Sequence, residues 1–94
     1  PLVSDSEAKN LLSELDGWII ESVSGIDQLV KTYKFSNYGE SLEFSNKVAD
    51  LAESEDHHPR IILEYGSVEV SWWSHKIKGL HKNDFICAAK TDLI

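Results

Sequence analysis

The sequence predicts an α+β fold, in which a four-stranded antiparallel sheet has three helices packed on one face. Two pairs of short apolar segments are each interrupted by turn residues, which is typical of paired antiparallel strands. Three other segments carry apolar residues at helical spacing, and helices of this length need an apolar sheet face to bury against. With 94 residues, 41% hydrophobic and 27% charged, the chain is expected to form a single domain over residues 1–94.

Capping residues and turn signals define the expected elements. Ser4 and Glu7 have the spacing of a capping box, Gly17 is typical of a helix end, and Asn37 is a plausible N-cap. The predicted order is α-β-β-α-β-β-α: a helix capped by Ser4 and closed by Gly17, strands Trp18–Val23 and Leu29–Phe35 around a turn at 24–27, a helix from Asn37 to about Ser54, strands Arg60–Tyr65 and Val68–His75, and a helix beginning near Lys82.

The turn between the last two strands predicts which residues face each other. Glycine stands first in the two-residue loop Gly66-Ser67, which is typical of a type II′ turn. In that register Ile61 faces Trp72, which is expected to be buried. Continued beyond the strand, the register places His58 opposite His75, with β-carbons roughly 4.5–5.5 Å apart.

Three histidines therefore come together in the prediction, and imidazoles are well suited to moving protons near neutral pH. Pro59 disfavours helical geometry at His58, so the chain should leave the helix near His57 and the two imidazoles should point in different directions. Glu53 lies four residues before His57, where a carboxylate could orient the imidazole.

Composition limits the partners and the compartment. The net charge of -7 and the pI of about 4.9 disfavour direct binding to nucleic acid, because an acidic surface repels phosphates. The single Cys87 excludes an internal disulfide and is expected to be a small buried residue of the last helix. No apolar run is as long as a membrane span and no signal-peptide pattern is present, so a cytoplasmic location is expected.

The residues from Glu53 to Asp84 resemble a known signature. The pattern Glu53-x3-His57-His58-Pro59-x5-Tyr65-x9-His75-x8-Asp84 is similar to that of the pterin-4a-carbinolamine dehydratases, also known as dimerisation cofactors of a homeodomain transcription factor. The resemblance implies elimination of water from 4a-hydroxytetrahydrobiopterin to give quinonoid dihydropterin, which supports pterin recycling for aromatic amino-acid hydroxylases. It implies no metal or organic cofactor.

The resemblance also implies roles for individual residues and partners. His57 and His75 would be the acid/base groups, and His58 would chiefly hold the pterin. The remaining candidates are Pro59, Ser74 and Trp73 for substrate binding, with Trp73 expected opposite Arg60, and Glu53 and Asp84 as orienting or structural residues. A homodimer or homotetramer is expected, with an aromatic amino-acid hydroxylase or a transcription factor as a possible partner.

Some residues depart from the family pattern, and two alternatives stay open. Arg60 and Ile61 stand where an acidic residue and an aromatic are frequent, His81 is a poorer N-cap than Ser or Thr, and Lys76 follows His75 where neutral residues are frequent. A non-catalytic oligomerisation or regulatory module of the same fold is the main alternative. A metal-dependent hydrolase is the other, but adjacent histidines are an uncommon ligand spacing.

Overall fold

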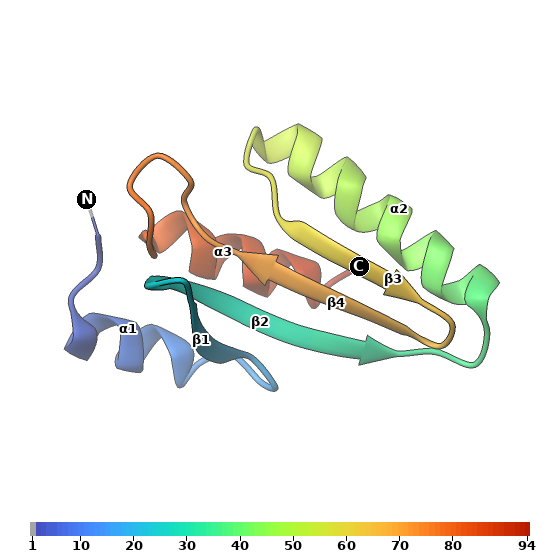
Figure 1. The fold of residues 1–94 in the computed structure, drawn as a ribbon, viewed down its shortest axis with the longest axis horizontal. Coiled ribbons are helices and arrows are strands. Elements are labelled where there is room, and N and C mark those ends of the chain that lie inside the picture. The colour runs from blue at the N-terminus through green and yellow to red at the C-terminus, as the bar shows by residue number, and fades with distance from the viewer. Residues whose placement is uncertain (1) are drawn as a thin grey trace.

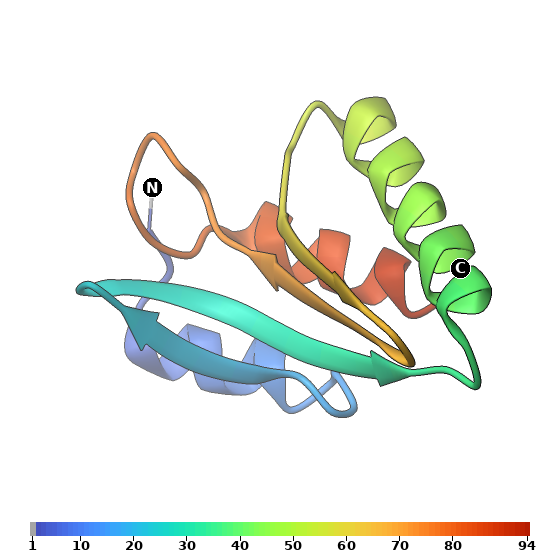
Figure 2. The same ribbon diagram turned by 45° about the vertical axis from the view of Figure 1, so that its right-hand side comes forward.

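The computed structural model describes residues 2–94 and confirms the predicted order of elements (Figure 1). The strands form one antiparallel sheet in the order β1-β2-β4-β3, so that two hairpins are joined through β2 and β4. Figure 2 shows α2 beside β3 and α1 below the β1–β2 hairpin. The elements are α1 (Asp5–Leu12), β1 (Ile19–Val23), β2 (Ile26–Lys34), α2 (Tyr38–Glu55), β3 (Arg60–Glu64), β4 (Ser67–Trp72) and α3 (Lys82–Thr91).

One face of the sheet forms the core together with all three helices. Trp72 is fully buried there and Cys87 is buried within α3, as the sequence predicted. The buried and half-buried apolar residues that pack together come from the sheet (Leu29, Val68, Val70, Trp72), from α1 (Ala8, Leu11, Leu12), from α2 (Phe44, Val48, Ala52) and from α3 (Phe85, Cys87, Ala88).

Helix α1 begins as predicted but ends early. The Ser4 hydroxyl accepts a hydrogen bond from the amide three residues on, at 3.2 Å, and so caps the helix. The predicted end at Gly17 is wrong, because the helix ends at Leu12. The Ser13 hydroxyl donates to the Asn10 carbonyl at 2.6 Å, the kind of local bond that competes with helical bonding. Gly17 instead takes a positive φ of 82° just before β1.

The β1–β2 turn is tighter than predicted. Val23 pairs directly with Ile26, leaving only Ser24 and Gly25 in the turn. Their φ values of 54° and 79° are both positive, as a type I′ hairpin turn requires. The predicted turn over residues 24–27 is therefore too long, and β2 begins three residues before the predicted start at Leu29.

The β3–β4 hairpin does not have the predicted register. The two-residue turn is Tyr65-Gly66, with glycine second at a φ of 76°, and Glu64 pairs with Ser67. Ile61 consequently faces Val70 rather than Trp72. The Phe35 amide donates to the Gly66 carbonyl at 2.8 Å, which ties this turn to the end of β2. The error is a shift that leaves each side chain on its predicted face of the sheet.

Candidate active site

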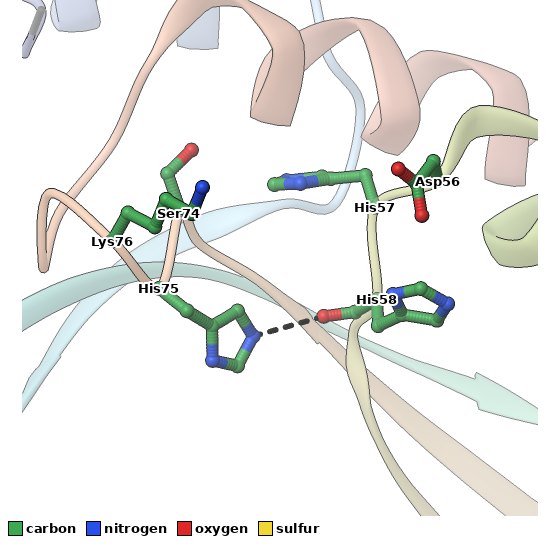
Figure 3. Close-up of a pocket in the computed structure, with 6 residues that line it drawn as sticks. All are labelled: Asp56, His57, His58, Ser74, His75 and Lys76. Carbon is green, nitrogen blue, oxygen red and sulfur yellow. Dashed lines mark hydrogen bonds between the residues drawn. The ribbon is translucent and has the colours of Figure 1, made fainter.

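The three histidines predicted to converge line one pocket of about 610 Å³ (Figure 3). The pocket lies where the connection from α2 to β3 meets the loop after β4. Its lining residues are Asp56, His57, His58, Ser74, His75 and Lys76.

The end of α2 turns His57 away from the helical path. Asp56 adopts the left-handed conformation, with φ 50° and ψ 42°, immediately after the last helical residue. The His57 amide donates to the Ala52 carbonyl at 3.1 Å and the Asp56 amide donates to Glu53, which together form a Schellman motif. Because the chain reverses here, residue 57 no longer occupies the helical position one turn after residue 53.

His57 faces inward as a result. Its side chain is only 15% exposed, and its ring stacks on Trp72 with centroids 5.6 Å apart and planes 10° apart. Nε2 of His57 lies 2.5 Å from a carboxylate oxygen of Asp84, which is fully buried. The expected contact between Glu53 and His57 is therefore wrong, and Asp84 on α3 is the partner instead.

Asp84 connects the pocket to the start of α3. Its other carboxylate oxygen accepts hydrogen bonds from the Ser74 hydroxyl and from the His81 amide, each at 2.8 Å. The bond to His81 completes a capping box, as expected for a structural residue at the third helical position. His81 serves as the N-cap in spite of being a poor residue for it, since its ring nitrogen accepts from the Asn83 amide at 3.2 Å.

His58 and Glu53 form a separate, exposed pair. The distance from His58 Nε2 to the Glu53 carboxylate is 2.6 Å, and the two side chains are 55% and 77% exposed. Figure 3 shows the His58 ring turned away from the His75 ring.

His75 contacts the backbone of His58 through its side chain. Its Nε2 lies 3.0 Å from the His58 carbonyl oxygen, drawn as the dashed line in Figure 3. The predicted cross-strand pairing of His58 with His75 is wrong, because the ladder ends where Arg60 pairs with Ser71. The same register overturns the predicted pairing of Arg60 with Trp73. Trp73 instead packs against the His75 ring, with centroids 4.4 Å apart.

The predicted site residues thus fall into two groups, those that line the pocket and those that do not. His57, His58, Ser74 and His75 line the pocket. Glu53, Asp84 and Trp73 are outside the lining and contact residues within it, and Pro59 is not part of the lining. Asp56 and Lys76 also line the pocket but are not among the site residues predicted from the sequence. The sequence did carry a signal for each, since Asp56 is a carboxylate that could orient a neighbouring imidazole and Lys76 departs from the family pattern directly after His75.

The hydrogen bonds define which nitrogens remain free. Carbonyl oxygens and carboxylates accept, so Nε2 of His75 and Nε2 of His57 are assigned as the protonated nitrogens. Nδ1 of each ring then has no hydrogen-bond partner among residues 2–94. The pocket therefore combines two imidazoles whose ring orientations are each held by a hydrogen bond.

Within residues 2–94, no cluster of three or more His, Cys, Asp and Glu side chains is arranged to hold a metal ion. None of the helices in the described part of the chain is long and apolar enough to cross a membrane.

Comparison with known proteins places this arrangement in a family. The model of the family described as Pterin 4 alpha carbinolamine dehydratase matches residues 1–94. The chain belongs to the pterin-4a-carbinolamine dehydratase family. A relative from Vibrio cholerae, provisionally named as a pterin-4-alpha-carbinolamine dehydratase, is 58% identical over 92 residues, which is 98% of this chain and 84% of the relative. One from Saccharophagus degradans with the same provisional name is 56% identical, over 98% of this chain and 81% of its own length.

Two solved structures share the fold of this dehydratase-family chain. A transcriptional coactivator/pterin dehydratase from Brucella melitensis superposes with a TM-score of 0.87 at 29% identity, covering 99% of this chain and 97% of its own. A pterin dehydratase-like protein described as a RuBisCO assembly factor of the alpha-carboxysome superposes with a TM-score of 0.68 at 20% identity, covering 82% of this chain and 87% of its own. The second similarity concerns the fold alone.

Proposed function

We propose that this chain is a dehydratase that eliminates water from 4a-hydroxytetrahydrobiopterin to give quinonoid dihydropterin. The observation that carries the proposal is the pair of oriented imidazoles, His57 held by buried Asp84 and His75 held by the His58 carbonyl, in one pocket. Family membership supports the same reaction. The product would be recycled by a reductase for aromatic amino-acid hydroxylation, and a cytoplasmic location suits that role.

The reaction needs one proton donor and one proton acceptor. A proton must reach the leaving 4a-hydroxyl, and another must leave a ring nitrogen of the pterin. We assign His57 as the donor, because the Asp84 carboxylate at 2.5 Å balances the positive charge of an imidazolium. His75 then accepts the ring proton through its free Nδ1. General acid–base catalysis of this kind is typically worth about 10²–10⁴-fold in rate.

The other candidate residues bind the pterin or support the residues that do. His58 is proposed to hold the pterin from the second side of the pocket together with Ser74. Trp73 acts by packing against His75 at 4.4 Å between ring centroids, and Pro59 fixes the chain direction between His58 and β3. No cofactor or metal takes part in the proposed reaction.

A coupled assay tests the proposal. A phenylalanine hydroxylase generates the 4a-carbinolamine, and the quinonoid product is followed by absorbance with wild type, His57→Ala and His75→Ala. Each substitution should lower the acceleration at least tenfold. The matched control is His81→Ser, which removes the remaining imidazole but keeps a good N-cap, and it should retain wild-type activity.

A non-catalytic oligomerisation or regulatory module is the second candidate. On α2, the side chains of Tyr38 and Leu42 are 48% and 43% exposed, whereas Phe44 is buried. Apolar residues exposed on one helix favour a protein contact there. The Brucella relative is described as a transcriptional coactivator as well as a pterin dehydratase, which supports a regulatory partner. Well-folded wild type that fails to accelerate dehydration would favour this second function.

A further inference from the structure

We propose that Lys76 is a specificity-determining residue, which selects pterins whose substituent carries a negatively charged group such as a carboxylate or a phosphate. The inference rests on the proposed function, since it takes the pocket to be a pterin site, and it extends the substrate class from tetrahydrobiopterin, whose side chain is neutral, to pterins with an anionic substituent.

The loop that carries Lys76 is held in place at its base. Ser74 and Gly79 form an isolated β-bridge, with the Ser74 amide donating to the Gly79 carbonyl at 2.8 Å. Lys78 has a positive φ of 52° and reverses the chain within the loop. The base of the loop is continuous with the site, because the Ser74 hydroxyl also bonds Asp84. Lys76 is therefore presented from a defined position beside the histidines.

The Lys76 side chain is directed into the pocket. Figure 3 shows it extending past Ser74 with its nitrogen toward the His57 ring, and it belongs to the pocket lining. Lys78, two residues along the same loop, lines a different hollow beside the N-terminal helix. The two lysines thus share a loop and are both exposed, but they line different pockets.

The charge of Lys76 has no carboxylate partner among residues 2–94. The lysines in ion pairs within this part of the chain are Lys31, Lys47, Lys82 and Lys90. Lys76 is also the single lysine or arginine in the pocket lining, where Asp56 supplies the carboxylate. This places an ammonium group that is in no ion pair with the described residues at the site where a ligand would bind.

Such a group discriminates between ligands by their charge. A pterin ring is the same in every candidate substrate, so a contact from Lys76 to the ring would strengthen binding of all pterins equally. A contact to an anionic substituent strengthens only the charged ones. An exposed ion pair changes affinity by about two- to fivefold and weakens as salt rises.

Binding of three oxidised pterins, measured by isothermal titration calorimetry at low salt, tests the inference. The probes are neutral 6-hydroxymethylpterin, pterin-6-carboxylate and the phosphate ester of 6-hydroxymethylpterin. Wild type should bind both anionic probes about two- to fivefold more tightly than the neutral one. Lys76→Ala should remove this preference, the matched control Lys78→Ala should keep it, and high salt should reduce it.

The outcomes separate the inference from the proposed function. Equal affinity of wild type for all three probes overturns the role of Lys76 and leaves a pterin site standing. An equal loss for all three probes in Lys76→Ala overturns it as well, because that result places the contact on the ring. Loss of the preference for anionic probes in Lys78→Ala as well as in Lys76→Ala also overturns the inference, because the preference would then come from the overall positive charge of the loop. Failure of every probe to bind contradicts the proposed function itself.

Discussion

Two carboxylate–imidazole pairs at the site differ mainly in burial. The Asp84 carboxylate is fully buried against His57, whereas the Glu53 side chain is 77% exposed beside His58. Water screens the charges of an exposed pair, and holding two long side chains together costs conformational entropy. Such a pair therefore contributes only about 0–1 kcal/mol to the free energy of unfolding. Because Asp84 is fully buried, water cannot replace its hydrogen bond to His57. Asp84 is therefore the carboxylate on which the orientation of the His57 imidazole depends.

A matched pair of amide substitutions tests this difference. Asp84→Asn should lower kcat by about 10–100-fold, the usual cost of removing a supporting partner, while Glu53→Gln should change it less than threefold. Both variants remove one carboxylate and keep the side-chain size. Circular dichroism and urea unfolding establish that each variant is folded before its activity is compared.

The pH dependence distinguishes positioning from loss of structure. If Asp84 acts through the charge on His57, the pH profile of kcat should change shape in Asp84→Asn and remain unchanged in Glu53→Gln. A uniform decrease across all pH values would assign Asp84 a structural role only, through its bond to the His81 amide.

The candidate residues could be named from the sequence, but their pairings could not. The convergence of the three histidines was predicted from the sequence, although through a β3–β4 register that the structure does not have. The partner of His57 depends on the left-handed conformation of Asp56, which no glycine signals in the sequence. A helical continuation would have put His57 near Glu53, and the reversal at Asp56 brings it to Asp84 instead.

At the level of single elements, the turn of the β3–β4 hairpin depends on Gly66. Its φ of 76° favours glycine, and a β-carbon there would lie 3.2 Å from the Phe35 carbonyl oxygen. Gly66→Ala should lower the free energy of unfolding by about 1–2 kcal/mol. The control is Gly39→Ala in α2, where the added carbon meets only the Asn37 side-chain oxygen at 3.4 Å and alanine is the better helix former. Urea unfolding should rank Gly66→Ala clearly below the control, and equal stabilities would contradict the observed turn.

This hairpin also shows why the fold was predictable and the register was not. Ile61 and Leu63 remain on the core face in both the predicted and the observed register, because the shift preserves the alternation of side chains. The apolar pattern therefore determines which face of the sheet each side chain occupies, and the turn determines which residues of β3 and β4 pair. The hydrogen bond from the Phe35 amide to Gly66, which helps to select the turn, joins residues of different hairpins and has no local sequence signal.

Hydrogen bonds to the Asp92 carboxylate join the end of α3 to the sheet. This carboxylate accepts hydrogen bonds from Lys31 at 2.8 Å, from the Trp18 indole at 3.0 Å and from the Tyr33 hydroxyl. Burial acts to raise the pKa of Asp92, but these hydrogen bonds outweigh it and hold the pKa below its ordinary value of 3.8. A carboxylate with a lowered pKa stabilises the fold above its unfolded-state pKa, and this contribution is lost as the pH falls through the folded-state pKa.

Asp92→Ala should therefore lower the free energy of unfolding at pH 7 by about 1–2 kcal/mol, because Trp18 and Lys31 lose an acceptor. The difference from wild type should shrink as the pH falls below about 4. The matched control is Asp16→Ala, since Lys31 contacts only the backbone carbonyl of Asp16, at 2.8 Å. Urea unfolding across this pH range makes the comparison, and a difference that does not vary with pH would count against the role of the charge.

For the whole molecule, we expect self-association into a homodimer or homotetramer. The sheet ends in two edge strands, β1 and β3, and exposed edges are usually covered in natural proteins. Tyr38 and Leu42 add an exposed apolar surface on α2. Light scattering at micromolar concentration should give a mass of at least two chains, and Leu42→Glu should reduce it if α2 forms the contact. A clean wild-type monomer would contradict the expectation.

The most direct test of the account is whether His57 and His75 act as one acid/base pair. In the coupled assay, the double variant His57→Ala/His75→Ala is compared with the two single variants. Groups that act in the same step are strongly non-additive, so the double variant should be about as slow as the slower single variant. Multiplication of the two single effects would contradict a shared step, and an unchanged rate in the double variant would contradict histidine catalysis altogether.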